Sequence, residues 1–319
     1  MKIGIVTFHC ARNYGAVLQC RALYEVLKSM GHDVHVINYR PDAVTKPYWL
    51  WQDSFLLHPV KLIKVALNFP PELRRKMTFE RFEKTFSPVP PRYSLDMDAM
   101  VYGSDQIWNL RITGGDTAYF GAIDMSRGKK IAYAASCGDG HIPDEMLKGY
   151  MPMFHRIGVR EESLQKTLKT AGFSSELCLD PVLLAGDMLL EKLDAKCPVN
   201  RGYVLTYEAV DNTKVGELAV RIASERKLRV ESVSRSPYAK GIARFGPEEF
   251  VALIRNADCV VTSSFHAVAL SILLKKEYIY CQSGTAIDDR INGLLAQLEK
   301  HSLEELRSKS MAFLEEALQ

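Results

Sequence analysis

Short apolar runs alternate along the chain with segments of helical periodicity. Residues 2–8, 33–38 and 99–103 are apolar runs of strand length, which predicts buried strands. Residues 16–30 carry apolar side chains at helical spacing and end at Gly31, which predicts a helix between the first two strands. A strand, a helix and a second strand in this order predict a parallel sheet.

The same alternation continues to the end of the chain. Further strands are predicted at residues 130–136, 157–159, 202–207, 228–233, 259–261 and 278–281, and further helices at residues 213–226, from Gly246 onward, and at 267–274, 285–298 and 303–318. We therefore predict an α/β protein with two Rossmann-like domains built on parallel sheets. The first domain covers residues 1–180, with a helical insertion at about 48–95. A linker at 181–201 leads to the second domain at 202–298, and a last helix at 299–319 returns toward the first domain.

Composition places the chain among ordinary soluble proteins. Charged residues make up 25% and hydrophobic residues 47% of the 319 positions, and a net charge of +3 is too small to indicate a nucleic-acid partner. Seven cysteines without a CxxC pair favour a reducing cytosol over a disulfide framework or a zinc cluster.

The chain shows no pattern of a signal peptide or of a membrane span. No apolar run reaches the ~18 residues that a transmembrane helix needs, so we expect a cytoplasmic protein. The lysine-containing apolar segment at 58–67 leaves contact with the inner face of the membrane open. Packing of this segment on its own domain is the favoured alternative.

The chain from Ala257 to Leu274 is a predicted strand, a polar turn and a helix that is apolar all round. Such a turn lies at the carboxyl end of a parallel sheet, where open α/β proteins bind ligands. The helix N-terminus attracts anions, so Ser263 and Ser264 are candidate anion ligands and His266 is a candidate proton donor. The structural alternative is that His266 only fills a helix end.

Residues 9–15 form a polar loop after the first strand, and the loop lacks the GxGxxG pattern of a dinucleotide site. Asn13 and Tyr14 are candidate acceptor contacts, and Gly15 would let a ligand approach the backbone. Alternatively, Asn13 only caps the following helix.

Polar residues also follow the strand at 99–103. Asp105 and Gln106 are candidates for binding sugar hydroxyls, with Trp108 as a stacking wall. Alternatively, Asp105 caps a turn and Trp108 belongs to the core. Arg160, at a strand end, either pairs with an acid such as the adjacent Glu161 or clamps a carboxylate or phosphate.

Seven motifs occur in a fixed order. They are Asn13-Tyr-Gly-Ala-Val-Leu-Gln19, Gly103-Ser-Asp-Gln-Ile-Trp-Asn109, Val159-Arg-Glu-Glu-Ser163, Asp180-Pro-Val-Leu-Leu184, Gly246-Pro-Glu-Glu-Phe250, Thr262-Ser-Ser-Phe-His-Ala267 and Asp289-Arg-Ile-Asn-Gly-Leu294. Each motif alone is weak, but in this order and spacing they resemble the polysaccharide pyruvyl transferase family. The resemblance runs from residue 1 to about residue 298.

The resemblance implies two facing domains like those of GT-B glycosyltransferases. It also implies transfer of an enolpyruvyl group from phosphoenolpyruvate to a sugar of a surface polysaccharide or its lipid-linked precursor. The product would be a pyruvate ketal, with release of phosphate and without a metal or organic cofactor.

Three residues match the family's functional positions. His266 matches the conserved histidine, and Arg160 and Arg290 match the donor-binding arginines. Asp105 would orient or deprotonate the attacking hydroxyl. We expect Arg160, His266 and Arg290 to share one anion site.

One position departs from the family pattern. Many members carry Arg two residues before the histidine, where this chain has Ser264. Arg235 and Lys240, in a polar loop, are candidates to replace that charge.

Two other functions remain open. One is a nucleotide-sugar glycosyltransferase on the same two-domain plan, weakly suggested by Glu248 and Glu249. The other is a non-catalytic sugar-binding relative that has lost the donor site, for which Ser264 is the hint. Phosphate release from phosphoenolpyruvate in the presence of candidate sugars distinguishes the three.

Overall fold

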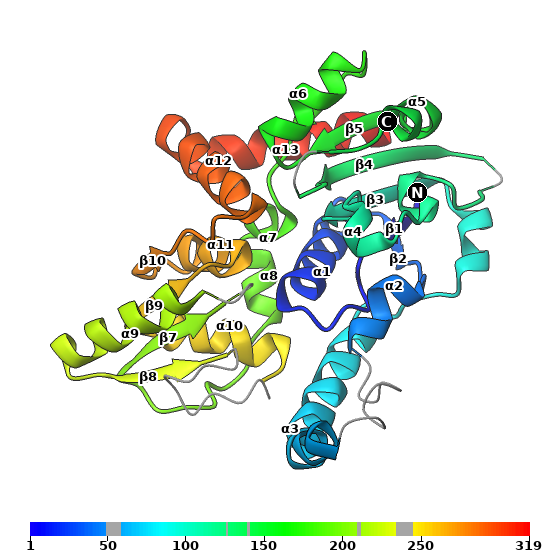
Figure 1. Ribbon diagram of the computed structural model, residues 1–319. Helices are drawn as coiled ribbons and strands as arrows, with labels where there is room; N and C mark the ends of the chain where they lie inside the picture. The colour runs from blue at the N-terminus through cyan, green and yellow to red at the C-terminus, as the bar shows by residue number, and fades with distance from the viewer. Residues whose placement is uncertain (49–58, 126, 139–140, 209–211, 234–244) are drawn as a thin grey trace. The chain divides into compact units, whose positions relative to one another are not determined.

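The computed structural model describes residues 1–48, 59–125, 127–138, 141–208, 212–233 and 245–319. The chain forms two compact units, and each contains its own parallel sheet (Figure 1). Unit 1 consists of Met1–Val44, Phe86–Lys192 and Gly284–Gln319, and unit 2 of Thr45–Thr85 and Leu193–Ser283.

Unit 1 contains a six-stranded sheet of order β2-β1-β3-β4-β5-β6, in which all neighbours are parallel. Its strands are β1 (Lys2–Val6), β2 (Asp33–Val36), β3 (Ala99–Asp105), β4 (Lys129–Ala135), β5 (Arg156–Val159) and β6 (Glu176–Leu177). Its α-helices are α1 (Tyr14–Ser29), α4 (Leu110–Thr113), α5 (Asp144–Tyr150), α6 (Glu162–Thr170), α7 (Pro181–Ala185), α8 (Asp187–Lys192), α12 (Ala286–Lys300) and α13 (Leu303–Leu318). Three 3-10 turns complete it, η3 (Pro91–Asp96), η4 (Thr117–Phe120) and η5 (Met151–Met153).

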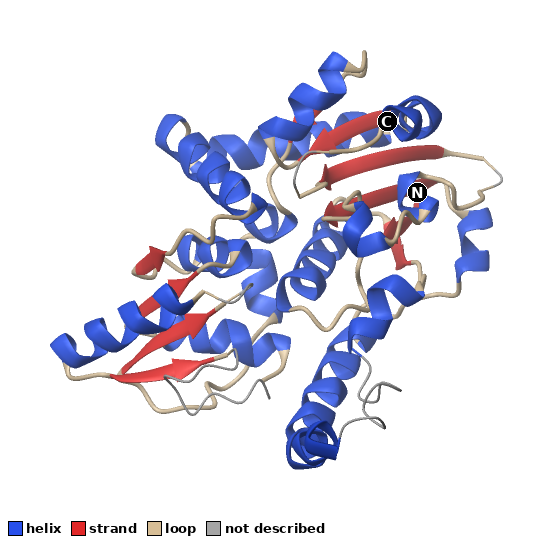
Figure 2. Cartoon of the chain, in the orientation of Figure 1, coloured by secondary structure: helices blue, strands red, loops and turns tan. Residues whose placement is uncertain are grey.

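Unit 2 contains a four-stranded parallel sheet of order β10-β9-β7-β8. Its strands are β7 (Tyr203–Tyr207), β8 (Arg229–Ser232), β9 (Cys259–Thr262) and β10 (Tyr278–Tyr280), and its helices are α3 (Pro59–Lys84), α9 (Thr213–Arg226), α10 (Pro247–Asn256) and α11 (Phe265–Leu273). The short α2 (Asp42–Thr45) and η1 (Lys46–Tyr48) lie where the chain passes from unit 1 to unit 2. Figure 2 shows the strands of each sheet accompanied by helices.

The two sheets share one topology. In unit 1, β2 pairs with one edge of β1, and β3 pairs with the other edge. In unit 2, β8 and β9 pair in the same way with β7. Each sheet therefore has a topological switch point, at β1/β3 and at β7/β9, where ligands of open α/β sheets bind at the carboxyl ends of the strands.

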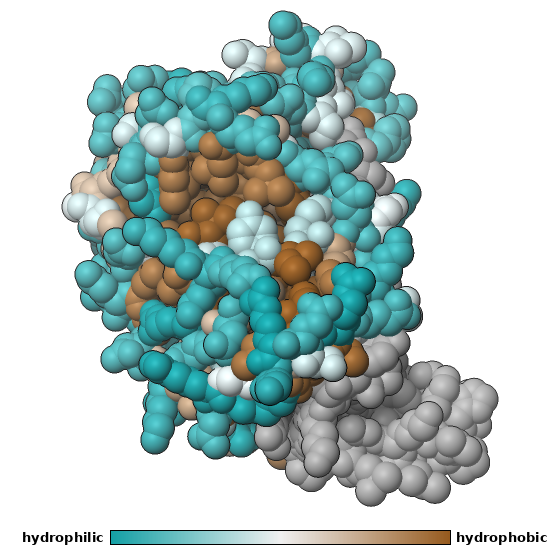
Figure 3. Space-filling view, turned by 90° about the vertical axis from the view of Figure 1, so that its left-hand side faces the viewer, coloured by the Kyte–Doolittle hydropathy of each residue, from teal (hydrophilic) through white to brown (hydrophobic). Residues whose placement is uncertain are grey.

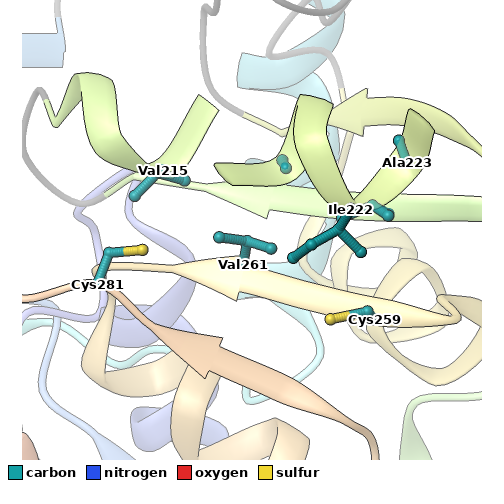
Figure 4. Close-up of a cluster of buried hydrophobic side chains, with 8 residues drawn as sticks. Val215, Ile222, Ala223, Cys259, Val261 and Cys281 are labelled. Atoms are coloured by element: carbon teal, nitrogen blue, oxygen red, sulfur yellow. The ribbon is translucent and has the colours of Figure 1, made fainter. Parts of the chain in front are cut away.

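Helix α9 and the sheet of unit 2 bury one continuous apolar cluster (Figure 4). Val204 of β7 and the alternate residues Cys259 and Val261 of β9 belong to this cluster, and the alternation follows from the two-residue period of a strand. The cluster comprises Val204, Val215, Ala219, Ile222, Ala223, Cys259, Val261 and Cys281. Full burial of each Val or Ile contributes about 1.5–3 kcal/mol, so this contact fixes the strand from which the turn at Ser263 begins.

The two parallel sheets and their helices confirm the predicted α/β class. The units divide the chain differently from the sequence-based domains in two places. Residues 284–298 group with unit 1 rather than with the second domain, and most of the insertion at 48–95 groups with unit 2. Within unit 2, α3 packs on α10, with Arg74 and Glu249 at 3.7 Å.

The predicted linker at 181–201 is partly helical. It contains α7 and α8, and Asp180 with Pro181 provides the N-cap and first turn of α7. Helix α13 packs on β4 and α7 in unit 1, where Ser310 Oγ accepts a hydrogen bond from the Leu179 amide at 2.9 Å.

No helix among the described residues is long and apolar enough to cross a membrane. The face shown in Figure 3 is mostly hydrophilic, with hydrophobic residues gathered in patches. The side chains of the apolar segment at 58–67, which was considered for membrane contact, lie outside the described residues, as do Trp49 and Trp51.

Candidate functional site

The carboxyl end of β3 carries Asp105 in an unusual backbone conformation. Asp105 has φ of 76°, in the left-handed region that costs a non-glycine residue roughly 1–3 kcal/mol. Just before it, Gly103 has φ of 130°, and a Cβ there would lie 2.1 Å from the Tyr133 carbonyl oxygen. The strand end can therefore follow this path only with glycine at 103.

A buried hydrogen-bond network holds this strand end against α1. Gln19 Nε2 donates to Thr7 Oγ1 at 2.8 Å, and Gln19 Oε1 accepts from the Ser104 amide at 3.0 Å. Thr7 Oγ1 donates to the Ser104 carbonyl, and Ser104 Oγ donates to the Ala134 carbonyl. These bonds join β1, α1, β3 and β4, so the Asp105 backbone is fixed from several sides.

Arg160 follows β5 and is paired with carboxylates of its own chain. Its Nη1 donates to Asp180 Oδ2 at 2.6 Å, and its Nη2 lies 3.7 Å from Asp105 Oδ1. Burial alone would lower the pKa of the Arg160 guanidinium, but Asp180 and Asp105 outweigh this effect and raise it. The partner of Arg160 is thus Asp180, twenty residues along the chain, rather than the neighbouring Glu161.

Arg290, on α12, joins the same cluster, where the carboxyls of Glu161, Asp105 and Asp180 act on its charge. Its side chain is 6% exposed, and its Nε is buried without a hydrogen-bond partner among the described residues. Burial and the positive charge of Arg160 lower the pKa of Arg290 to about 10, although Glu161 and Asp105 act in the opposite direction. An anion bound at Arg290 would relieve both unfavourable effects.

Glu161 completes the cluster. Its Oε1 accepts a hydrogen bond from the Cys137 amide at 3.0 Å, whereas its Oε2 is buried without a partner in the described structure. Burial raises the pKa of this carboxyl, and Arg160 and Arg290 only partly offset the rise.

In unit 2, the turn after β9 carries hydroxyl and imidazole groups. Ser264 is the N-cap of α11, with φ of −95°, and its Oγ accepts from the Ala267 amide at 3.4 Å. Thr262 Oγ1 accepts from the Ser264 amide at 3.0 Å, while Ser263 Oγ is buried without a partner in the described residues. His266 is the second residue of α11 and is 8% exposed.

The predicted acceptor residues differ in exposure. Asn13 is exposed, and its Oδ1 caps α1 by accepting from the Ala16 amide at 3.2 Å. Gln106 is half-buried, and its Oε1 accepts from Asn109 Nδ2 at 2.9 Å. Tyr14 is 1% exposed and presents no surface to a sugar.

The prediction of Trp108 as a stacking wall is wrong. Its ring is fully buried, stacks on Phe120, and donates from Nε1 to the Tyr119 carbonyl at 3.0 Å. A large aromatic side chain with a satisfied N–H is a stable core residue.

The structure brings Asp105, Arg160 and Arg290 together in unit 1, and Ser263, Ser264 and His266 together in unit 2. Each unit is described by itself, so a shared site of the two groups stays a prediction. Arg235 and Lys240, the candidates to replace the missing arginine, lie outside the described residues.

A family model described as polysaccharide pyruvyl transferase matches residues 13–281, which is most of the chain. The chain belongs to this family. The family acts in polysaccharide pyruvyl transfer, so the chain is a transferase of this general kind with a sugar or polysaccharide acceptor. Arg290 lies outside the matched range.

A search of curated proteins finds no match. Among solved structures, this pyruvyl transferase family member is similar to a UDP-GlcNAc 2-epimerase from Neisseria meningitidis bound to UDP-GlcNAc, at 11% identity and a TM-score of 0.49, over 100% of this chain and 99% of that chain. It is also similar to the E. coli heptosyltransferase WaaC with ADP-2-deoxy-2-fluoro heptose, at 12% identity and a TM-score of 0.42, over 94% of this chain and 99% of that chain. These values are too low to support an argument about fold or function.

Sequence reasoning missed three members of the unit 1 site. Asp180 was named only as the first residue of a motif, although Asp before Pro is a helix N-cap signal. Glu161 was considered only as a partner for Arg160, and its contact with the Cys137 amide has no local signal. Gln19 belongs to the first of the seven motifs. Its hydrogen bond to Ser104 joins residues 85 positions apart, so no local pattern indicates it.

Proposed function

We propose that this pyruvyl transferase takes an enolpyruvyl group from phosphoenolpyruvate and transfers it to a sugar of a surface polysaccharide or its lipid-linked precursor, closing a pyruvate ketal. The observation that carries the proposal is the buried Arg290, whose Nε has no hydrogen-bond partner among the described residues. A buried donor group in this state is satisfied where a ligand supplies an acceptor. Phosphoenolpyruvate offers both a carboxylate and a phosphate.

The turn in unit 2 supports the same proposal from its own chemistry. Ser263 Oγ is buried without a partner in the described structure, and it precedes the N-terminus of α11, a helix end that favours negative charge. Ser264 is already engaged as the N-cap, so in our proposal it supports the turn and Ser263 contacts the anion.

The proposed reaction needs one proton donor and one base. His266 gives a proton to the methylene carbon C3 of the donor, so that C2 becomes electrophilic. A sugar hydroxyl adds to C2, and Asp105 takes its proton. The bond from C2 to the phosphate oxygen then breaks, a second hydroxyl of the sugar adds to C2, and its proton leaves with the phosphate. Asp105 then releases its proton to solvent and His266 regains one, so the balance is one ketal and one phosphate from one donor and one diol, without a metal or organic cofactor.

In this scheme Arg160 positions Asp105 rather than contacting the donor. Its guanidinium is held by Asp180, and its second nitrogen faces Asp105 at 3.7 Å. A base held by a neighbouring cation keeps one orientation. Asp105 is therefore positioned to accept the hydroxyl proton as the new bond forms.

The test is turnover with purified protein, phosphoenolpyruvate and a panel of sugars that carry neighbouring or 4,6-related hydroxyl pairs. We expect phosphate release that depends on the sugar, together with a sugar product that has gained a pyruvate ketal. Hydrolysis of a nucleotide sugar without consumption of phosphoenolpyruvate would instead favour a glycosyltransferase. Absence of both reactions, with sugar binding retained, would favour a non-catalytic relative.

A further inference from the structure

The unit 1 site holds more negative than positive formal charge. Among the described residues its carboxyls are those of Asp105, Glu161 and Asp180, and its guanidiniums those of Arg160 and Arg290. With every group ionised the sum is two positive minus three negative charges, or one net negative charge. A site with this charge repels an anion, although Arg290 is suited to bind one.

The three carboxyls are not equivalent. Asp180 accepts from Arg160 Nη1 and from the Val182 amide, so both of its oxygens are engaged. Asp105 accepts from the Gln106 amide and faces Arg160. Only Glu161 keeps a buried oxygen, Oε2, without a partner in the described part of the site.

The surroundings of Glu161 come from three neighbouring elements. After β4, the Cys137 amide and thiol face its Oε1, and the Ser136 hydroxyl lies close enough to the carboxyl to act on its pKa. Arg160 precedes it after β5, and Arg290 approaches from α12. The carboxylates of Asp105 and Asp180 act on the same two arginines. Burial outweighs the two guanidiniums and raises the pKa of Glu161, so its neutral form is accessible.

We propose that Glu161 takes up a proton when an anionic donor binds at Arg290, and that the resulting carboxylic acid donates a hydrogen bond from Oε2 to the anion. The proposal rests on the proposed function for the identity of the donor, a small carboxylate or phosphate compound. Protonation removes the excess negative charge, because two guanidiniums then face two carboxylates. It also supplies the missing partner for Oε2, since a protonated carboxyl is a donor whereas an ionised one only accepts.

The test is isothermal titration calorimetry of phosphoenolpyruvate in two buffers of different ionisation enthalpy, at about pH 6 and about pH 8. The slope of apparent enthalpy against buffer enthalpy gives the number of protons taken up on binding. Wild type is compared with Glu161→Gln, which keeps the shape and the hydrogen-bond donor but cannot titrate. Glu162→Gln is the matched control, because Glu162 is the neighbouring carboxylate on the exposed face and pairs with Lys166 at 3.8 Å.

At the higher pH we expect wild type and Glu162→Gln to take up about one proton more per bound donor than Glu161→Gln. The apparent Kd of wild type should rise by up to about tenfold per pH unit once Glu161 ionises, and that of Glu161→Gln should rise less. Since the donor phosphate also titrates, only the difference between variants is used. Equal proton uptake in wild type and Glu161→Gln, with both binding, would overturn the proposal.

Two further results separate this proposal from the proposed function. If phosphoenolpyruvate does not bind, inorganic phosphate is titrated in the same buffers. Phosphate binding with proton uptake that Glu161→Gln removes would retain the Glu161 proposal and reject the donor. Failure of phosphate binding as well, or loss of binding in a folded Glu161→Gln protein, would reject the proposal itself.

Discussion

The turn after β3 and the turn after β9 occupy the same place in their sheets but differ in chemistry. Each follows the strand that pairs with the first strand of its sheet across the switch point. The turn of unit 1 joins a buried cluster of guanidiniums and carboxyls, and Asp105 there has a left-handed backbone. The turn of unit 2 carries hydroxyls and His266 at the start of α11.

This difference indicates a division of roles between two copies of one topology. Fixed charges, with Arg290 Nε still open to an acceptor among the described residues, are suited to hold an anion and to position a base. A hydroxyl and a histidine at a helix N-terminus are suited to make hydrogen bonds and to move a proton. Topology thus specifies where each turn lies, and the side chains specify what the turn can do.

The largest expected effect concerns the proton donor in unit 2. His266→Ala should lower kcat by roughly 10²- to 10⁴-fold and change the KM for phosphoenolpyruvate much less. If His266 only fills the helix end, the loss would be about 1 kcal/mol of stability with near-normal kcat. Steady-state kinetics and melting temperature distinguish the two.

Ser271→Ala is the matched control for His266→Ala. Ser271 lies on the same helix, is fully buried, and donates to the Ala267 carbonyl at 2.7 Å. The control should lose stability with kcat retained.

The next effect compares the two arginines of unit 1 by stability. Arg160→Met leaves Asp180 buried without its ion-pair partner, so the free energy of unfolding should fall by about 3–5 kcal/mol. Arg290→Met removes a buried charge that has no ion pair in the described residues, so stability should change little or increase. Denaturant titration of both variants measures this. Equal destabilisation would contradict the distinction between a paired and an unpartnered arginine.

The same pair of variants differs in donor recognition. Arg290→Met should raise the KM for phosphoenolpyruvate by about 10- to 100-fold, because a charged hydrogen bond contributes about 1.5–3 kcal/mol. Arg290→Lys should raise the KM less, because lysine restores the positive charge but not the planar guanidinium that binds an anion through two nitrogens. A normal KM in folded Arg290→Met would show that the donor does not bind there.

A smaller effect tests the cap of α11. Ser264→Ala should reduce the free energy of unfolding by about 1 kcal/mol, because the Ala267 amide loses its acceptor, and Ser264→Gly should cost only a few tenths. Thermal unfolding measures both. A loss of donor affinity in Ser264→Ala larger than the stability change would instead assign Ser264 to the donor.

The smallest effect is a pH dependence of stability. The pKa of Glu161 is raised by burial, so its favourable contribution is fully present below its unfolded pKa and is lost as pH rises through its folded pKa. Glu161→Gln should therefore gain stability relative to wild type with increasing pH across this range. Denaturant unfolding at several pH values checks the direction, and a constant difference would contradict the raised pKa.

Much of the fold could be predicted from local patterns. The strands of both sheets except β6, and the helix α9, follow from apolar runs and periodicity, which depend on neighbouring residues only. The grouping of residues 284–298 with unit 1 and of α3 with α10 could not, because these depend on contacts between distant segments. The helical character of 181–192 had a local signal in Asp180-Pro181 that was not used.

The candidate site, like the fold, could be predicted from local sequence patterns only in part. Polar residues after strands indicated Asp105, Arg160 and His266, since strand ends of a parallel sheet meet at one edge. Tyr14 and Trp108 were predicted as sugar contacts, but both side chains are buried. No local sequence pattern distinguishes a buried aromatic residue from an exposed one at a turn. The pairing of Arg160 with Asp180 depends on two loops that meet only in the folded sheet.

The most direct test of the account is sugar-dependent phosphate release from phosphoenolpyruvate, measured side by side for wild type, Arg290→Met and His266→Ala, with mass analysis of the sugar. The account predicts that wild type releases phosphate and forms a pyruvate ketal. It also predicts that a high concentration of phosphoenolpyruvate restores the rate of phosphate release in Arg290→Met but not in His266→Ala. Sugar-dependent release by His266→Ala at the wild-type rate, or a wild-type sugar that never gains a pyruvate ketal with any acceptor, would contradict it.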